Sequence, residues 1–224
     1  MPIQQMAHFQ PAICISNNSN FVSMTSAIKK IALVALWAIL TVFSTNAQDA
    51  TMWMVDKAHT SVNFSINHFF STVTGKFSKF DGMVHFDPAN LKGSRVDFNV
   101  EVPSVNTGEE KRDQHLQSND FFDSGTYPKM SFVSSKFVKK SENEYLVHGK
   151  LTIRNTTKDI ILPLKVTGEM EHPMMKGNLI LGLSTNLKIK RTDYGVGTGN
   201  WAATMVVGDD VDVNIHMELN RKKS

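Results

Sequence analysis

The chain of 224 residues has nearly balanced charge, with 24 lysines and arginines against 21 aspartates and glutamates. Two of the basic residues, Lys29 and Lys30, lie in the first 47 residues, so the remainder carries 22 basic and 21 acidic side chains, a net charge of +1. A charge so close to zero gives no electrostatic basis for binding nucleic acid. The single cysteine, Cys14, also lies in the first 47 residues, which excludes a disulfide within the remainder.

The N-terminal segment has the pattern of an export signal. Lys29 and Lys30 precede an uncharged apolar run over 31–43, and small residues follow up to Ala47. The pattern predicts a signal peptide over 24–47 that is cleaved after Ala47. The apolar run is shorter than the roughly 20 residues of a membrane span, although a retained signal anchor is the alternative.

Removal of this signal leaves one domain over 48–224. Met24 stands where a signal peptide should begin, so we interpret 1–23 as an extension before the true translation start. We expect the processed protein to be soluble and periplasmic or secreted, with no membrane span.

The segment 61–67 alternates strictly between apolar and polar residues. Val62, Phe64 and Ile66 fall on one face, which is the pattern of a half-buried β-strand. His59 precedes this strand, and His68 continues it. An apolar face with an imidazole near each end is consistent with an ordinary core and also with the lining of a pocket.

Further strands are expected next along the chain. The run 72–80 leads through Asp81-Gly82 into 83–86, and an Asp-Gly pair between apolar runs predicts a tight hairpin. The run 94–102 again alternates between apolar and polar residues.

The connection over 104–129 is much longer than the roughly 2–5 residues of a hairpin link. It contains a polar and charged stretch at 109–118, which predicts one short helix, followed by Phe121 and Phe122. A segment this long in an antiparallel sheet is typical of one that caps an opening or carries function. We expect the two phenylalanines to act as hydrophobic lids.

Strand signals return in the second half. The expected strands span 130–139, 144–153, 158–169, 178–189 and 209–219. About eight strands in one domain indicate an all-β fold, either a closed antiparallel barrel or a sandwich. We favour the closed barrel, because closure removes exposed strand edges.

Four blocks carry a specific pattern: WMVDKAHTSVNFSINHFFSTVTGKFSKFDG over 53–82, PSVNTGEEKRDQHLQSNDFFDSGTYPKMSF over 103–132, GKLTIRNTTK over 149–158 and RTDYG over 191–195. Together they resemble the YceI-like family of exported bacterial proteins. The resemblance implies a lipocalin-like antiparallel β-barrel whose interior binds a long apolar molecule, a polyisoprenoid or an isoprenoid quinone. It also implies a binding protein rather than an enzyme.

The expected interior suits such a ligand. A barrel of about eight strands has an interior that side chains fill or that holds one slender molecule. Each buried methylene contributes about 0.8 kcal/mol, so a polyprenyl tail could bind without polar contacts. The residues predicted to line the lumen are Val62, Phe64, Ile66, Phe77, Val96, Phe98, Val100, Phe132, Val147, Leu151, Val211, Val213 and Ile215.

Polar residues near the mouth would orient a head group, and the candidates are His59, His68, Arg112 and His115. A histidine beside an apolar face is more often structural, and Arg112 with Asp113 is equally consistent with a local ion pair. The chain has no HExxH motif and no zinc-type cluster of cysteine and histidine. We therefore predict no metal site and no cofactor other than the bound lipid.

The sequence Gly-Val-Gly-Thr-Gly at 195–199 does not indicate a phosphate site. It lacks the following Lys-Ser/Thr and the βαβ context of a phosphate-binding loop. We expect a flexible hairpin loop there.

The predicted function is an exported carrier or scavenger of an apolar isoprenoid lipid, with a role in envelope stress, and without catalytic residues. The alternative is an enzyme acting on such a lipid, with His68, His115 and Asp113 as acid–base groups. The sequence is compatible with a homodimer.

Overall fold

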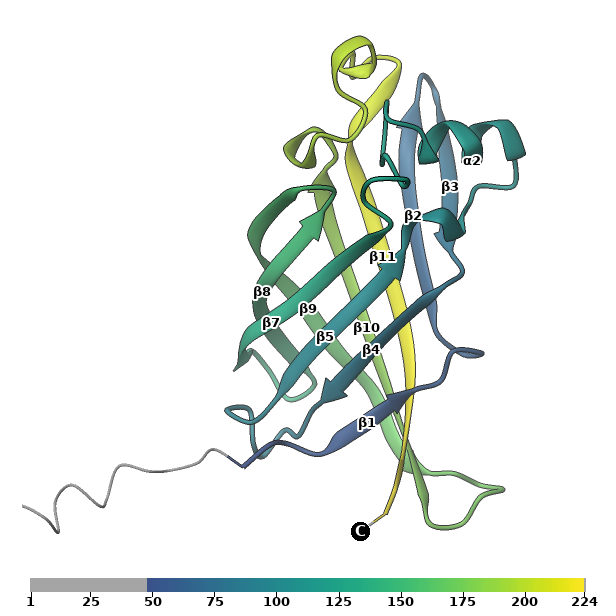
Figure 1. The fold of residues 1–224 in the computed structure, drawn as a ribbon. Helices are drawn as coiled ribbons and strands as arrows, with labels where there is room; N and C mark the ends of the chain where they lie inside the picture. The colour runs from purple at the N-terminus through teal and green to yellow at the C-terminus, as the bar shows by residue number, and fades with distance from the viewer. Residues whose placement is uncertain (1–47, 224) are drawn as a thin grey trace, which may run out of the picture. The chain divides into compact units, whose positions relative to one another are not determined.

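The computed structural model describes residues 48–223, so the predicted signal peptide and the segment 1–23 lie outside the described residues. The described part is an all-β domain with one short α-helix (Figure 1). None of its helices is long and apolar enough to cross a membrane. The strands are β1 (Met52–Val55), β2 (Ser61–His68), β3 (Ser71–Phe77), β4 (Phe80–His85), β5 (Arg95–Glu101), β6 (Val105–Asn106), β7 (Lys129–Lys139), β8 (Glu144–Ile153), β9 (Thr156–Glu171), β10 (Asn178–Lys190) and β11 (Val207–Lys222). The helices are η2 (Val102–Ser104), α2 (Glu110–Gln117), η3 (Thr192–Tyr194) and η4 (Gly199–Trp201).

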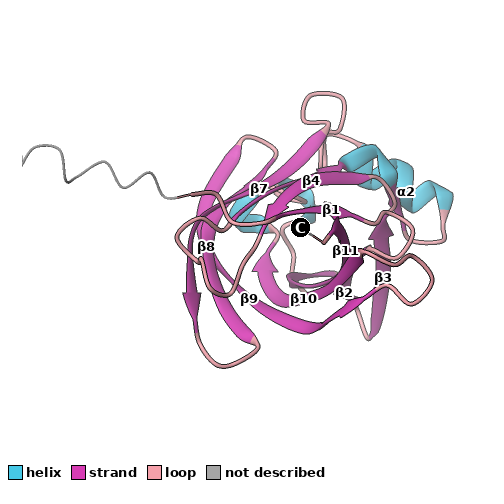
Figure 2. Ribbon diagram, turned by 90° about the horizontal axis from the view of Figure 1, so that it is seen from below, coloured by secondary structure: helices cyan, strands magenta, loops and turns pink. Residues whose placement is uncertain are grey.

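Eight strands form a closed antiparallel ring in the order β1-β4-β5-β7-β8-β9-β10-β11, and the ring closes where β1 pairs with β11. Figure 2 shows these strands end on, around the interior. The closed barrel predicted from the sequence is confirmed. The predicted short helix is also confirmed, in the connection between β6 and β7.

Strand β11 pairs with two different neighbours along its length. Its C-terminal part pairs with β1 at Leu219 and Asn220, and the part from Val207 to His216 pairs with β2. Strands β2, β3 and β6 therefore continue the sheet beyond the ring. They do so at the end of the barrel that carries α2 and the β2–β3 turn, which we call the α2 end (Figure 1). The other end carries the β9–β10 hairpin.

The interior is packed differently at its two ends. At the β9–β10 end, a compact core of large side chains includes Trp53, Phe137, Tyr145, Leu181 and Leu219. At the α2 end, two smaller clusters lie along the walls. One is built from β2, β3, β4, β5 and β6. The other joins Ile153 at the end of β8 to Tyr194 of η3, to Val196 after it and to Phe121 before β7. Side chains therefore fill the interior at the β9–β10 end, whereas at the α2 end they pack in separate clusters.

The hairpin predicted at Asp81-Gly82 is wrong. Both residues lie inside β4 and pair with β5, and the chain turns instead at Ser78-Lys79. Gly82 serves a close approach between strands, because a Cβ there would lie 2.6 Å from the carbonyl oxygen of Asp97 and 2.7 Å from the ring of Phe98. A glycine inside a strand often marks such an approach, and the local sequence does not distinguish it from a turn.

Candidate functional site

A cavity of about 500 Å³ lies inside the barrel at the α2 end, above the packed core. Its volume is within the range of about 300–1,000 Å³ that is typical of small-molecule sites. The lining is almost entirely aliphatic and aromatic, and it comes from β2, β3, β5, β7, β8, β9, β10, β11, α2 and the loops beside them. The charged lining residues are Lys111, Arg112 and Arg191, and the described residues place no carboxylate in the lining.

All of the predicted lumen residues except Val96 and Val147 line this cavity. Val147 is 2% exposed and belongs to the packed core at the β9–β10 end, and Val96 packs against that core. Both were assigned by strand parity, which gives the face to which a side chain points but not its height along the barrel. Ligand binding by the residues that do line the cavity stays a prediction.

The long connection between β6 and β7 covers one side of the cavity. Its helix α2 is capped by Glu109, whose carboxylate accepts hydrogen bonds from the backbone N–H groups of Lys111 and Arg112. Beyond the helix, Phe121 and Phe122 line the cavity as predicted. The ring of Phe122 meets Phe77 of β3 edge to face at 6.0 Å between centroids. The connection therefore supplies a wall that no strand ladder provides.

Arg112 and Asp113 both bind Thr107 rather than each other. Asp113 Oδ1 accepts hydrogen bonds from the Thr107 backbone N–H at 2.8 Å and from its hydroxyl at 2.6 Å. Arg112 donates from Nε to the Thr107 hydroxyl at 2.7 Å and from Nη2 to the Thr107 carbonyl at 2.9 Å. These bonds fix the approach to α2 and hold the guanidinium at the cavity wall. Arg112 and Asp113 therefore share Thr107 as a hydrogen-bond partner and do not form the direct ion pair that the sequence left open.

His115 stands in an aromatic cluster at the mouth. Its ring lies 5.0 Å from the ring of Phe121 and 4.9 Å from that of Trp201, both edge to face. His115 Nε2 is 2.9 Å from Asp120 Oδ2, and the Trp201 indole donates to the same oxygen at 3.3 Å. The contact with His115, followed by that with Trp201, holds the pKa of Asp120 below its ordinary value despite some desolvation.

The two histidines that flank β2 have different surroundings. His68 lines the cavity and pairs with Val207 across the strands. His59 lies beyond the other end of β2 with 66% of its side chain exposed, and it is not among the residues that line the cavity, so its head-group contact stays a prediction without support from the geometry. Its Nδ1 is 3.0 Å from Asp56 Oδ2 and 3.7 Å from Glu218 Oε1.

The sequence predicted no tight ligand cluster, yet Asp56, His59 and Glu218 offer three ligand-type atoms within 4.8 Å of one another. The carboxylate of Asp56 already accepts from the backbone N–H groups of Ala58 and His59 and from the amide of Asn220. The hydrogen bond to Asp56 raises the pKa of His59, and Glu218 adds to this effect. The arrangement is explained by a polar turn with an ion pair, on the surface and away from the cavity.

Arg191 is a buried residue that the sequence did not single out by itself. Its side chain donates to five backbone carbonyls, those of Val196, Gly197, Trp201, Val207 and Gly208. A guanidinium has five N–H donors, so the whole donor set is used. Burial lowers the pKa of Arg191, partly offset by the nearby Asp209.

These bonds order the glycine-rich segment for which we expected a flexible loop. Tyr194 and Val196 are buried, and Gly195, Gly197 and Gly199 adopt φ angles of 70°, 62° and 63° that favour glycine. The segment forms part of the cavity rim through Tyr194, Val196 and Trp201.

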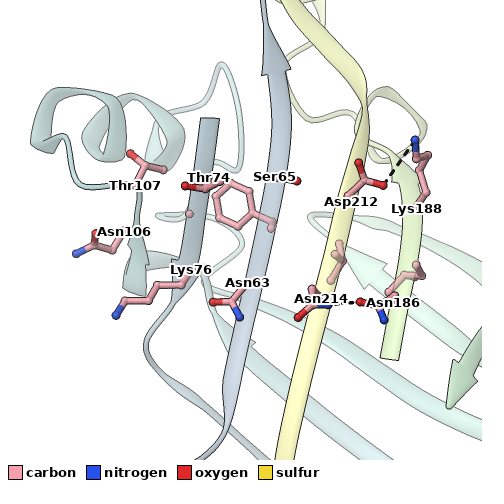
Figure 3. Close-up of a pocket in the computed structure, with 14 residues that line it drawn as sticks. Asn63, Ser65, Thr74, Lys76, Asn106, Thr107, Asn186, Lys188, Asp212 and Asn214 are labelled. Atoms are coloured by element: carbon pink, nitrogen blue, oxygen red, sulfur yellow. Dashed lines mark hydrogen bonds and ion pairs between the residues drawn. The ribbon is translucent and has the colours of Figure 1, made fainter. Parts of the chain in front are cut away.

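A second concavity, of about 820 Å³, lies on the outer face of β2, β3, β10 and β11 (Figure 3). Strand register aligns a row of polar side chains across it, consisting of Asn186, Asn214, Asn63, Lys76 and Asn106. Lys188 lies near Asp210 and Asp212 on the same face. This groove therefore combines amide, hydroxyl and charged side chains with Phe64, Leu187 and Val213, unlike the largely apolar inner cavity.

The fold and the inner cavity together define a lipocalin-like β-barrel with an apolar interior. The model of the YceI-like domain matches residues 53–219, and the chain belongs to this family. The YceI protein of Escherichia coli O157:H7 is 33% identical over 197 residues, covering 87% of this chain and 100% of that protein. A UPF0312 protein of Vibrio cholerae is 32% identical over 194 residues, covering 85% of this chain and 97% of that protein.

Solved structures agree with this assignment. Burkholderia cenocepacia BcnA superposes with a TM-score of 0.66 at 30% identity, covering 75% of this chain and 99% of that chain. The Campylobacter jejuni YceI protein gives 0.63 at 37% identity, with 75% and 96% covered. A polyisoprenoid binding domain from Saccharophagus degradans gives 0.57 at 17% identity, with 77% and 98% covered, which shows a shared fold.

Proposed function

We propose that this protein is an exported carrier or scavenger that holds one long isoprenoid lipid, a polyprenyl chain or an isoprenoid quinone, inside the barrel. The observation that carries the proposal is the apolar cavity, whose charged lining residues are all cationic. Burial of each methylene of a tail there contributes about 0.8 kcal/mol. The name of the Saccharophagus degradans domain supports the same ligand class.

The head group would lie beside α2. Arg112 uses Nε and Nη2 for Thr107, which leaves the N–H groups of Nη1 to donate to a phosphate or quinone oxygen. Lys111 adds a second cation from α2, and His115 and His68 add imidazoles. An anionic or carbonyl-bearing head group matches this set of donors better than a cationic one.

Export is the second part of the proposal. The basic pair, apolar run and small residues before Gln48 support secretion to the periplasm or medium, where the protein would act as a monomer or homodimer. We further propose that the protein acts during envelope stress, as a scavenger of such lipids would. N-terminal sequencing of the protein fractionated from its host should find Gln48 first in the soluble envelope fraction. A form that retains residues 29–43 and sediments with membranes would contradict this.

The test of the ligand is mass spectrometry of organic extracts from the protein purified from its native host. We expect about one unmodified prenyl lipid per chain, and the mass distinguishes a polyprenyl phosphate from a quinone. The matched control is Val213→Trp purified in parallel, which should lack the lipid because the indole occupies the cavity. Equal lipid in both proteins would mean that the lipid binds elsewhere, and absence from the parent would overturn the proposal.

The enzyme alternative receives less support from the geometry. Asp113 is engaged with Thr107 and His115 with Asp120, so the carboxylate and imidazole of the suggested acid–base set have separate partners. A lipid recovered with a modified head group would favour the enzyme.

A further inference from the structure

Two apolar tips project side by side at the α2 end. Phe69 and Phe70 form the two-residue turn between β2 and β3, with 58% and 106% of their surfaces exposed, and Met205 in the loop before β11 is 88% exposed. The backbone N–H of Phe69 donates to the carbonyl of Val206 at 3.0 Å. The three side chains therefore belong to one surface, which we call the mouth tip.

The mouth tip is free of charged side chains in both of its segments. Residues 58–75 and 194–208 contain no aspartate, glutamate, lysine or arginine, although these make up 20% of the whole chain. Trp201 stands in the second segment, beside the cavity. A protein interface of ordinary composition combines an apolar centre with a polar rim. Two convex, uncharged tips with a neighbouring tryptophan match the boundary of a lipid bilayer instead.

The opposite end of the barrel provides a contrast. Its β9–β10 hairpin also exposes apolar side chains, with Met174 at 86% and Met175 at 49%. There, however, Glu171 pairs with Lys223 next to the methionines, and Lys176 follows them in the sequence. Charges beside an apolar tip oppose insertion into hydrocarbon, so exposure alone does not distinguish the two ends.

The mouth tip is continuous with the cavity. His68 directly precedes Phe69 and pairs with Val207, and both His68 and Val207 line the cavity. An apolar molecule that passes between the cavity and the mouth tip would remain next to apolar side chains.

The turn itself places phenylalanine where the backbone disfavours it. Phe69 has a φ of 50°, and two-residue hairpin turns usually place glycine or asparagine at such positions. A bulky side chain at positive φ is an uncommon and strained choice. The ring of Phe69 meets that of His68 edge to face at 4.8 Å, and neither Phe69 nor Phe70 belongs to a buried core cluster of the described residues.

We propose that the mouth tip inserts into the surface of a lipid bilayer, so that the cavity opens onto the membrane from which the lipid is collected. This inference rests on the proposed function for the source of the ligand. The partner is the apolar boundary of the bilayer rather than a charged head group, because the two segments that form the tip carry no cation to pair with phosphate, and Lys111 and Arg112 of α2 line the cavity.

Flotation with phosphatidylcholine vesicles tests the docking. The full chain is expressed, and the processed protein is purified and stripped of lipid. The parent should float with the vesicles in high salt. Phe69→Asn/Phe70→Ser should float at least about tenfold more weakly for each ring removed, and asparagine tolerates the positive φ at position 69. The control Met174→Ser/Met175→Ser should float like the parent. Equal flotation of the parent and the mouth-tip variant, or loss of flotation in the control alone, would overturn the proposal.

A second variant retains the apolar tip and reports on its surroundings. Phe70→Trp should show a blue shift of its added emission with vesicles, and brominated lipid chains should quench it. An emission that stays at the wavelength of a water-exposed indole would contradict insertion.

Uptake of a fluorescent polyprenyl phosphate analogue separates this proposal from the proposed function. Delivered from ethanol, the analogue should bind the parent and the mouth-tip variant equally. Delivered from vesicles, it should transfer at least about tenfold more slowly to the variant. A parent that floats but binds no analogue leaves docking intact and refutes the carrier. Equal rates from vesicles refute docking and leave the carrier intact.

Discussion

Phe64 of β2 lies directly opposite Gly75 of β3, and its ring occupies the space that a side chain at position 75 would need. The ring of Phe98 likewise lies against its direct partner Gly82, and the ring of Phe132 covers Gly149, which pairs with Ser134. All three phenylalanines line the cavity. The shape of the cavity therefore depends on glycines in the neighbouring strands.

Replacement of Gly75 by alanine should lower stability. The new Cβ would meet the Phe64 ring and lie 2.9 Å from Thr107 Cγ2, so the ring must turn or the strand must shift, at a cost of about 1–3 kcal/mol. Urea unfolding measures this change. Gly168→Ala is the matched control, because no heavy atom lies within 4 Å of a Cβ there. Equal midpoints for the two variants would show that the ring moves freely.

Val213→Trp should abolish binding of a fluorescent polyprenyl analogue while the lipid-free protein stays folded, because Val213 faces the cavity. The control is Val147→Trp in the packed core, where overpacking should cost about 1–3 kcal/mol or more. Melting temperature and analogue binding are measured on both variants. If Val213→Trp melts at as low a temperature as the control, the cavity at the α2 end has no free space for a ligand.

Arg191→Lys should destabilise the rim of the cavity. An ammonium has three donors in place of five, so at least two buried carbonyls lose their partner, and about 2 kcal/mol or more of unfolding free energy is expected to be lost. Amide hydrogen exchange should accelerate over 192–208. Arg95→Lys is the control, because its ion pair with Asp49 is exposed and worth little. Unchanged hydrogen exchange over 192–208 would show that the hydrogen bonds of Arg191 do not hold this segment in place.

Acid should weaken the same rim through Asp209. The hydrogen bond from the Thr192 hydroxyl, followed by that from the Thr192 backbone N–H and by the charge of Arg191, lowers the pKa of Asp209 from its ordinary 3.8. The unfolded chain therefore binds the proton first, and the contribution of Asp209 to stability is present above about pH 4 and lost as the pH falls through the lower folded pKa.

Urea midpoints at about pH 6 and about pH 3 should therefore differ less for Asp209→Asn than for the parent. Thr192→Val, which removes the first of these hydrogen bonds, should show an intermediate difference. An identical acid response in all three proteins would assign the pH dependence to other groups.

The long strands were predictable because alternation with period 2 is a local signal. The segment 61–67 and the last strand show it plainly, and the structure places both within strands, β2 and β11. The short helix was predictable for a similar reason, since its polar composition interrupts the strand pattern at 109–118. The barrel was favoured over the sandwich because closure removes exposed strand edges, and the family blocks imply the same fold.

Strand register and contacts between distant parts of the chain were not predictable in the same way. The partner strand of Gly82 and the height of Val147 depend on register, which alternation along one strand does not give. Arg191 donates hydrogen bonds to five backbone carbonyls between residues 196 and 208. Every residue has such a carbonyl, so the sequence does not show which ones will accept. The association of His115, Asp120 and Trp201 likewise joins segments far apart in the chain.

The cavity is closed on one side by α2 and the residues after it, which pack through Leu116 and Phe122 and accept hydrogen bonds at the carbonyls of Asp120 and Phe121. No residue of α2 itself is buried. Lifting the cover would break no rung of the eight-stranded ring, so we expect the free energy that holds the cover in place to be separate from the one that holds the barrel together. For the lipid binding proposed above, we therefore expect substitutions on this cover to change the residence time of the ligand more than they change the melting temperature.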